Sequence, residues 1–378
     1  MQHYHYIFTG TGLSAMVTVY EMVVSGKFKD NSILLIDENA KKTNDRTWCF
    51  WDEKTDFDSI VSKTWNTALF ADENFKRALN LKPYQYKMVK GLDFYNHVLA
   101  VILQEKNIHF IQQKVTDFEE LGNHCIVKTE SQSYTCNQVF NSIFNPEIIK
   151  SQSKYPLLQQ HFIGWFVKSK TAVFNPNQAT FMDFSVAQKG NTRFMYVLPF
   201  SETEALVEYT LFSKDLLETS EYENAIQDYL QKLGIAEYEI TEKEHGNIPM
   251  TSYLFWKHNS KNIINIGSAG GWTKASTGYT FKNSIKKSKA LVQLLSTETD
   301  FRKHHKKDKF WFYDLLFLDV LNRNNEKGSQ VFAALFRAGN PTLIFKFLDE
   351  ETSFSEDLQV IWKCPKLLFI RALLGRIF

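Results

Sequence analysis

A glycine turn near the start of the chain constrains the fold more than any other sequence feature. Residues 6–9 are a short apolar run typical of a strand, and residues 10–15 follow with the spacing G-x-G-x-x-A. Residues 15–24 suit a helix packed on a sheet, and residues 32–36 form a second apolar strand that ends in an Asp-Glu pair. This order predicts a βαβ unit that binds a dinucleotide.

Such a turn has the chemistry that a dinucleotide needs. Glycines let the backbone approach a pyrophosphate, and the free N–H groups at the start of the helix carry partial positive charge. An acid after the second strand can accept hydrogen bonds from a ribose. A glycine-rich turn in an ordinary α/β fold is the alternative, and one of the two acids could be only a solvated charge. The residues expected to contact the cofactor here are Gly10, Gly12, Leu13, Ser14, Ala15, Asp37 and Glu38.

A second glycine segment lies late in the chain. A strand is expected over residues 263–266, then the glycine turn, then a helix that runs to Leu295. Flavoproteins of the glutathione-reductase class complete their FAD site in this way, with an Asp where this chain has Ser268. Two such turns favour FAD over NAD, although a second structural βα turn is the alternative. The cofactor contacts expected here are Gly267, Ser268, Ala269, Gly270, Thr277 and Gly278.

Length and pattern together predict a chain of several parts. At roughly 150 residues per domain, 378 residues imply two or three units. Short aromatic-rich segments between residues 162 and 212 indicate a mostly antiparallel sheet, and residues 216–233 indicate an amphipathic helix. The expected fold is α/β with α+β insertions, in which a Rossmann-like FAD-binding domain of the glutathione-reductase type carries an inserted substrate domain and a helical C-terminal arm. The predicted parts are 1–70, 90–150 and 258–298 for FAD binding, 71–89 and 151–257 for the substrate sheet, and 299–378 for the arm.

Composition excludes several classes of protein. The chain has 44 Lys and Arg against 42 Asp and Glu, so its net charge of +2 gives no case for nucleic-acid binding. Its four cysteines show no CxxC spacing, so we expect buried thiols and no metal site. Neither a signal peptide nor an apolar run of about 18 residues is present, which predicts a cytoplasmic protein that does not span a membrane.

Motifs spread over nearly the whole sequence resemble a known family. The chain is similar to bacterial FAD-dependent lycopene cyclases of the single-chain type related to plant β-cyclases. Its most specific motif runs from Leu206 to Thr210 and resembles the one that holds the glutamate needed for the family's chemistry. Thr273-Lys274-Ala275 departs from the proline-containing stretch that is more usual there. The other matching segments are residues 10–15, 47–50, 182–184, 193–199, 244–249, 267–271, 276–279 and 347–350.

The resemblance implies an isomerase that acts on a linear carotenoid. Both ends of lycopene would be closed to β-ionone rings, giving γ-carotene and then β-carotene without net oxidation. The family uses reduced FAD, with NADPH or NADH as the reductant. We expect β rings only because bacterial members of the family usually form them. The sequence alone distinguishes neither β from ε rings nor the formation of one ring from the formation of two.

Ring closure needs a group that stays protonated in a dry site and delivers its proton to a carbon–carbon double bond. An alkene is a very weak base, and burial raises a carboxyl pKa so that the group stays protonated. Glu208, in an apolar run, is the expected acid; a surface glutamate on an edge strand is the alternative. Asp183 is the second candidate, expected to orient Glu208 or to take the final proton, unless it only caps a turn. Expected pocket walls are Trp48, Phe50, Tyr196 and Tyr279, with core packing equally open for each.

The end of the chain suggests contact with a membrane surface. Residues 310–318 and 367–378 are very apolar, and Lys363, Lys366, Arg371 and Arg376 alternate with the apolar residues of the last segment. A basic amphipathic helix can lie in a bilayer interface, and lycopene dissolves in lipid. We therefore expect a peripheral protein on the inner face of the cell membrane; a helix packed on the substrate domain is the alternative. The basic stretch 304–307 could face anionic headgroups or form a solvated loop.

Two other functions fit the same motifs. A flavin-dependent monooxygenase or halogenase would share the fold, although hydroxylases usually carry a mid-chain Asp-Gly segment that we do not find. A non-catalytic flavoprotein that binds isoprenoids would return lycopene unchanged. The sequence leaves the oligomeric state open.

Overall fold

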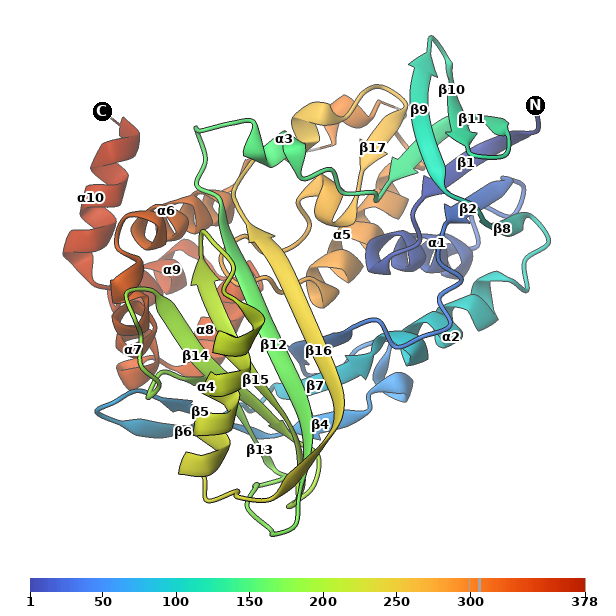
Figure 1. Ribbon diagram of the computed structural model, residues 1–378. Helices are drawn as coiled ribbons and strands as arrows, with labels where there is room; N and C mark the ends of the chain where they lie inside the picture. The colour runs from blue at the N-terminus through green and yellow to red at the C-terminus, as the bar shows by residue number, and fades with distance from the viewer. Residues whose placement is uncertain (299, 305–306, 378) are drawn as a thin grey trace.

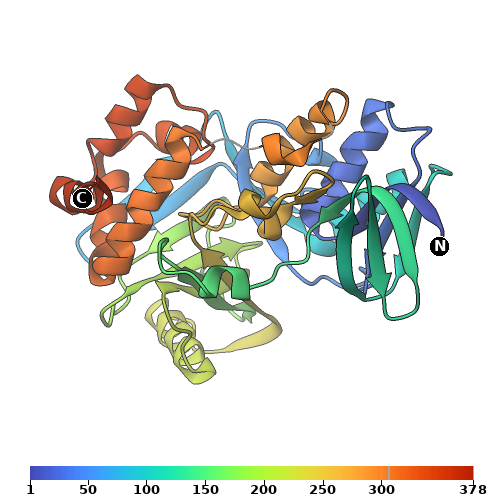
Figure 2. The same ribbon diagram turned by 90° about the horizontal axis from the view of Figure 1, so that it is seen from above.

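The computed structural model describes residues 1–298, 300–304 and 307–377. Two large sheets lie side by side, and a small third sheet and a set of C-terminal helices complete the molecule (Figure 1). The N-terminus belongs to the sheet at one end, and the last helices lie at the opposite end, as the view from above also shows (Figure 2).

The first large sheet contains the predicted βαβ unit. Its order is β8-β2-β1-β11-β10-β9, and β17 pairs with the end of β11. The pairs β1–β2, β1–β11, β2–β8 and β11–β17 are parallel, whereas β9, β10 and the start of β11 form an antiparallel extension. The strands are β1 (His3–Thr9), β2 (Ile33–Asp37), β8 (Ile108–Gln112), β9 (Val115–Leu121), β10 (His124–Thr129), β11 (Ser133–Asn141) and β17 (Ile263–Asn265).

Helices α1 (Leu13–Ser25), α2 (Gly91–Ile102) and α5 (Phe281–Leu294) pack together beside this sheet. Small hydroxyl residues let α1 and α5 approach closely: Ser14 and Thr18 of α1 hydrogen-bond to Ser284 and Ser288 of α5 at 2.8 and 2.9 Å. Residues 33–36 of β2 form a continuous buried apolar run, as expected for a parallel strand covered on both faces.

The second large sheet is mostly antiparallel, as predicted, with the order β16-β12-β15-β14-β13-β5-β6. One pair, β13–β5, is parallel. Helix α4 (Thr219–Lys232) covers one face through an apolar cluster that includes Val207, Tyr209 and Ile226. The strands are β5 (Thr67–Ala71), β6 (Lys76–Asn80), β12 (Leu158–Ser169), β13 (Gln178–Asp183), β14 (Thr192–Pro199), β15 (Glu204–Ser213) and β16 (Tyr238–Met250).

The other face of the second sheet is covered by the small sheet and by C-terminal helices. These parts share one core, in which Leu206 and Phe212 of β15 pack with Trp51, Tyr86 and other buried side chains. The small sheet has the order β3-β7-β4, with β3 (Thr47–Asp52), β7 (Gln85–Lys90) and β4 (Lys63–Trp65). The remaining helices are α3 (Glu147–Lys150), α6 (Lys309–Arg323), α7 (Gly328–Ala338), α8 (Pro341–Leu348), α9 (Phe354–Ile361) and α10 (Lys366–Ile377).

The sheets cross the predicted division at two points. β3 and β4 were assigned to the FAD-binding part, yet they pair with β7, whose residues 85–89 were assigned to the substrate part. Residues 67–70 were assigned to the FAD-binding part, yet they belong to β5 and pair with β6 and β13 of the second sheet. The partner β13 lies about 110 residues further along the chain, so no local pattern reveals this pairing. Among the described residues, no helix is long and apolar enough to cross a bilayer. His305, Lys306 and Phe378 of the predicted membrane-facing segments lie outside the described residues.

Candidate active site

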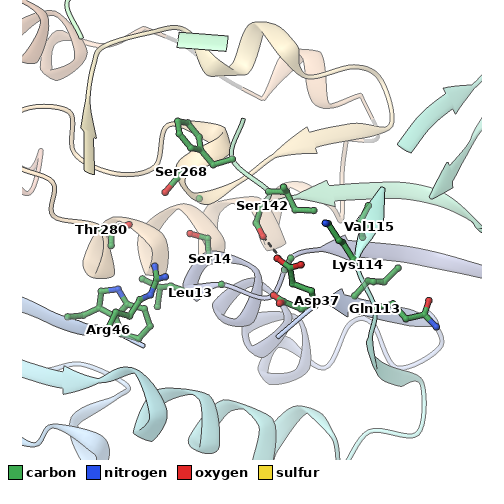
Figure 3. Close-up of a pocket in the computed structure, with 18 residues that line it drawn as sticks. Leu13, Ser14, Asp37, Arg46, Gln113, Lys114, Val115, Ser142, Ser268 and Thr280 are labelled. Carbon is green, nitrogen blue, oxygen red and sulfur yellow. Dashed lines mark hydrogen bonds between the residues drawn. The ribbon is translucent and has the colours of Figure 1, made fainter. Parts of the chain in front are cut away.

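A cleft with a cavity volume of about 420 Å³ opens where β1, β2 and β11 end and α1 begins. Small-molecule sites usually span about 300–1,000 Å³. Its labelled side chains extend from Gln113 and Lys114 beside Asp37 at one end to Arg46 and Thr280 at the other (Figure 3). Eight of the thirteen predicted cofactor residues line this cleft: Gly10, Gly12, Leu13, Ser14, Asp37, Glu38, Gly267 and Ser268.

The glycine turn has the geometry of an anion site. Gly10 has a φ of +80°, and a Cβ there would lie 2.6 Å from Ser142 Oγ, so both conformation and space require glycine. Gly12 is the N-cap of α1 and offers no side-chain cap, and a Cβ on it would meet nothing within 4 Å. The first turn of α1 carries no acid. The first N–H groups of the helix are thus left for an approaching anion.

Asp37 stabilises this turn as well as lining the cleft. Its carboxylate accepts hydrogen bonds from Thr11 N at 2.6 Å and Thr11 Oγ1 at 2.9 Å, and it pairs with Lys41 at 3.3 Å. Arg46 and Lys114 also line the cleft and add positive charge that suits a pyrophosphate. Sequence reasoning missed both. Lys114 could have been found, because it follows β8 and the carboxyl ends of parallel strands meet at one edge.

Five predicted cofactor residues lie outside this cavity: Ala15, Ala269, Gly270, Thr277 and Gly278. Ala15 is fully buried in the packing of α1. Gly270 serves close backbone packing, since a Cβ there would lie 2.2 Å from the carbonyl oxygen of Asn265. Gly278 touches the second sheet instead, where a Cβ would lie 2.2 Å from Gln160 Oε1. The late glycine segment therefore links the cleft to the second sheet, on the face that packs against the small sheet and the C-terminal helices. We call this face the inner face.

Two buried polar atoms at this junction suit a bound cofactor. Among the described residues, neither Thr277 Oγ1 nor Gln160 Oε1 has a hydrogen-bond partner, although both atoms are buried. Buried polar atoms are rarely left in this state, and a ligand group is a common explanation. The anion turn fits the pyrophosphate of a dinucleotide such as FAD, and the two atoms outside the cleft leave hydrogen bonds for a further group.

Glu208 lies in the middle of β15 on the inner face of the second sheet, and it is 7% exposed. In the strand register it stands opposite Tyr196 of β14 on one side and Gly164 of β12 on the other. Gly164 in turn stands opposite Glu244 of β16. The result is a row of four positions, Glu244–Gly164–Glu208–Tyr196, across four neighbouring strands.

The surroundings keep Glu208 in its neutral form. Burial raises the pKa of Glu208 well above the usual range of a glutamate, and the nearby Glu244 carboxylate raises it further. The hydroxyl of Thr210, which donates a hydrogen bond to Oε1, acts in the opposite direction. A carboxyl group of this kind is a proton donor in a water-poor setting.

Three tyrosines lie on the same side of the sheet. The hydroxyl of Tyr86 is 2.6 Å from that of Tyr196 and 3.2 Å from that of Tyr279. Burial raises the pKa of Tyr86 and of Tyr196 well above the ordinary value, so the phenols stay neutral. Tyr196 and Tyr279 were predicted as pocket walls, and the structure brings both to the region of Glu208. Tyr86 was not predicted.

The structure corrects the pocket role predicted for Trp48 and Phe50. Side chains of β3 alternate, and these two point away from the second sheet. Phe50 stacks on Phe281 at 4.5 Å, and Trp48 packs edge-on against Phe94 at 5.3 Å while lining the nucleotide cleft. Their neighbour Cys49 has the opposite orientation, where burial raises its thiol pKa to about 12 and Glu208 and Glu244 act on it.

Asp183 does not lie beside Glu208. It stands opposite Met195 in the register, and Met195 belongs to the apolar cluster under α4, on the other face of the sheet. Its carboxylate accepts hydrogen bonds from Tyr229 of α4 at 2.9 Å and from the Ser185 backbone at 2.9 Å. The turn-capping alternative is therefore the one that the structure supports, and the predicted catalytic role is wrong.

A second surface feature lies on α9 and α10, which we call the C-terminal apolar patch. Of the fifteen exposed large hydrophobic side chains among the described residues, seven lie in the last 24 positions. They recur every three or four residues, so each helix presents them along one face. The patch consists of Phe354, Leu358, Trp362, Leu367, Ile370, Leu374 and Ile377, which are 47–72% exposed.

Not every basic residue of the tail faces outward. Arg376 forms a two-point ion pair with the buried Asp319 of α6, at 2.6 and 2.7 Å, and donates to the carbonyl of Lys154 at 2.7 Å. Of the four basic residues named in the last segment, Arg376 therefore fits the alternative of a helix packed on the protein. Lys363, Lys366 and Arg371 are exposed, and Lys366 Nζ lies 3.7 Å from the ring centre of Trp362.

Comparisons with solved structures agree with the fold. A flavoprotein/dehydrogenase from Cytophaga hutchinsonii superimposes with a TM-score of 0.66 over 99% of this chain and all of the other, at 12% identity. A geranylgeranyl bacteriochlorophyll reductase-like protein from Thermoplasma acidophilum gives 0.63 over 98% of both chains, at 11% identity. The flavin-dependent brominase Bmp2 gives 0.62 over 99% of both, at 12% identity. The predicted flavoprotein fold is confirmed.

Sequence comparisons identify the family. A stretch of 104 residues is 31% identical to a lycopene beta-cyclase of Paracoccus sp.; it covers 26% of this chain and 27% of that relative. The family model described as lycopene cyclase protein matches residues 6–374, which is almost the whole chain. The chain therefore belongs to the lycopene cyclase family and is an enzyme of that family, as its motifs predicted.

Proposed function

We propose that this enzyme is a lycopene β-cyclase, which closes the ends of lycopene to β-ionone rings by acid catalysis with FAD bound in the cleft. The observation that carries the proposal is Glu208, a buried carboxyl with a strongly raised pKa, on the sheet face next to the late glycine segment. Family membership supplies the reaction, and the site supplies a carboxyl group that stays protonated and can therefore donate a proton.

The acid step begins at Glu208. Thr210 donates to one carboxyl oxygen, which leaves the other oxygen to carry the proton that is transferred to the terminal double bond of lycopene. The carbocation then attacks the next double bond, and a ring C–H bond gives up a proton, so that no electrons are gained or lost. Reduced FAD, when bound, supplies an electron-rich ring whose negative charge stabilises the cation.

Buried aromatic side chains protect the cation. Tyr86, Tyr196 and Tyr279 present ring faces and neutral phenols near Glu208, and each cation–π contact is worth about 0.5–2 kcal/mol. Water must be excluded, because a hydrated cation would give an alcohol instead of a ring. The same core excludes water through Trp51, which packs edge-on against Tyr279 at 4.6 Å.

Expression in a lycopene-accumulating host with pigment analysis tests the reaction. The wild type is expected to convert lycopene to γ-carotene and β-carotene. Glu208→Gln should keep its flavin and lose at least about 100-fold of the activity, which is the usual scale for a general acid. Glu204→Gln is the matched control, because Glu204 lies on the same strand, 45% exposed and paired with Lys168, and should change little.

Three results would contradict the proposal. Wild-type activity in Glu208→Gln would remove Glu208 as the acid. Bound lycopene that is returned unchanged would favour a non-catalytic isoprenoid-binding flavoprotein. NADPH oxidation coupled to oxygen consumption would favour a monooxygenase or halogenase.

We further propose that FAD acts in its reduced form and that NADPH or NADH is the reductant. Enzyme loaded with FAD should cyclise lycopene under anaerobic conditions after reduction by dithionite, and should be inactive when the flavin is oxidised. Each reduced flavin should support many turnovers, since no electrons leave with the product. One ring formed per flavin reoxidised would contradict this.

We propose that the C-terminal apolar patch docks on the inner surface of the cell membrane, from which the enzyme draws lycopene. Seven exposed apolar side chains bordered by Lys363, Lys366 and Arg371 have the composition of an interfacial surface. The triple variant Trp362→Ser, Leu367→Ser, Leu374→Ser should lose co-sedimentation with vesicles that contain anionic lipid. The control replaces Val24, Leu103 and Leu216, which are 51–61% exposed elsewhere, and should still bind. Equal binding by both triple variants would eliminate the patch as the anchor.

A further inference from the structure

A second carboxyl group, that of the partly buried Glu244, lies next to Glu208. Glu244 is on β16 and Glu208 is on β15, and the strand between them, β12, has Gly164 at the position that both face. A Cβ on Gly164 would lie 3.2 Å from Glu244 Cγ and 3.5 Å from Glu208 Cβ. It would also lie 2.9 Å from Leu206 Cδ1, closer than real Cβ contacts allow. The two glutamates therefore meet over a position that has no room for a side chain.

The groups around the pair are neutral or acidic. Glu208 accepts from Thr210, and Glu244 accepts from Thr47 Oγ1 at 3.4 Å. The titratable neighbours of the pair are Cys49 of β3, Tyr196 of β14, Tyr279 before α5, and Glu242 on β16 itself. Tyr86 of β7 lies behind the two tyrosines and contacts Tyr196. Among the described residues, no cation shifts the pKa of either glutamate.

Two carboxylates in such a place cannot both be charged at neutral pH. Like charges in a dry site repel strongly, so a close carboxyl pair holds one proton over a wide pH range. Burial raises the pKa of Glu244 to about 7, and it raises the pKa of Glu208 well above the ordinary range, with the Glu244 charge adding to that rise. Glu244 thus ionises first, and its charge keeps the proton on Glu208.

We propose that Glu244 is the second carboxyl group of the reaction: it holds the negative charge while Glu208 holds the proton, and it accepts the proton that the new ring gives up. The Glu208 O–H bond breaks as a C–H bond forms at the end of the polyene. A ring C–H bond then breaks and an O–H bond forms on Glu244. Transfer of that proton across Gly164 back to Glu208 restores the starting state, so protons and electrons balance. This inference rests on the proposed function.

The pH dependence of ring formation by the FAD-loaded, reduced enzyme tests the role of Glu244. In the wild type the rate should rise with pH through about 7, as Glu244 ionises, and fall at higher pH, as Glu208 loses its proton. Glu244→Gln should lower the rate by about 100-fold, abolish the rise near neutral pH and shift the fall to lower pH. Glu244→Asp keeps an ionisable group and should keep the rise. Glu239→Gln, exposed on the same strand, is the matched control and should match the wild type.

A second measurement does not depend on lycopene. The infrared C=O band of a protonated carboxyl should be present above neutral pH in the wild type and missing in Glu208→Gln. In Glu244→Gln that band should disappear at a lower pH than in the wild type. The proposed pair would be overturned if the band of Glu244→Gln disappeared at the same pH as in the wild type, or if the pH dependence of its rate were unchanged. The cyclase function would remain intact in either case. A wild type that forms no ring would instead overturn the proposed function, and the base role of Glu244 with it.

Discussion

Gly10 and Gly26 both have a left-handed backbone, but only Gly10 is crowded by a neighbouring side chain. Comparing the two separates the cost of backbone strain from the cost of a steric contact. Their φ values are +80° and +67°; a Cβ on Gly26 would meet nothing within 4 Å, whereas one on Gly10 would collide with Ser142 Oγ. Gly26→Ala should lower the free energy of unfolding by about 1–2 kcal/mol from backbone strain alone. Gly10→Ala should lower it further by about 1 kcal/mol or more, because Ser142 donates to the carbonyls of Thr9 and Gly10 and a shift breaks those bonds.

Urea unfolding and FAD titration of both variants check this prediction. Gly10→Ala should also weaken FAD binding, because the turn shapes the cleft, and Gly26→Ala should bind FAD like the wild type. Equal effects of the two substitutions on both measurements would show that contact with Ser142 has no role.

At the level of single residues, the sequence singled out Glu208 as the proposed acid but did not single out Glu244 beside it. Glu208 and the glycines of the turn lie in recognisable local motifs, so they could be predicted. Glu244 could not be chosen, because its position beside Glu208 depends on the register of β12 with two other strands. For Trp48 and Phe50, pocket wall and core packing were both open, because alternation along β3 says which residues share a face but not which face meets the second sheet.

At the level of elements, the ion pair between Arg376 and Asp319 fixes α10 against α6. Arg376→Gln would leave the buried Asp319 carboxylate without its partner on α10. Breaking such a pair typically lowers the free energy of unfolding by about 3 kcal/mol, or somewhat less where one partner is partly exposed. We expect faster proteolysis and faster amide exchange over residues 366–377. Arg371→Gln, on the exposed side of the same helix, should leave both rates unchanged. Equal protection in Arg376→Gln and the wild type would mean that apolar contacts alone hold α10.

Elements defined by local pattern were predicted closely, and those defined by distant pairing were not. The first strand, helix and second strand begin and end within about three residues of their predicted limits, and the predicted helix at 216–233 is α4. The late glycine turn is a short 3-10 segment, η3 (Gly267–Gly270), before the expected helix. The parallel pair β13–β5 joins segments far apart in the chain, which no local pattern reveals.

For the whole molecule, the buried glutamates make stability depend on pH. The pKa of Glu244 rises from the ordinary value of 4.5 to about 7 on folding. Between these values the folded state binds more protons than the unfolded state, so stability falls as pH rises and the loss is complete above pH 7. The free energy of unfolding of Glu244→Gln should therefore exceed that of the wild type by about 2–3 kcal/mol above pH 7. Below about pH 4.5 the two values should be equal.

Thermal or urea unfolding of both proteins across this pH range checks the prediction. His161 limits the acid side: burial lowers its pKa to about 4, so stability is lost as pH falls from 6.5 towards that value in both proteins alike. A stability difference between Glu244→Gln and the wild type that does not change with pH would mean that Glu244 is ionised in the folded protein throughout.

The place of β16 at the border of its sheet has a consequence for how the enzyme is recharged between turnovers. Glu244 sits on this outermost strand and is only partly covered, whereas Glu208 lies two strands further in. Of the proposed pair, Glu244 is therefore the member that can exchange a proton with bulk water if one is lost. Under the proposed mechanism, Glu208 would then regain its proton along the row of strands from the edge of the sheet, without water crossing the apolar core that covers it.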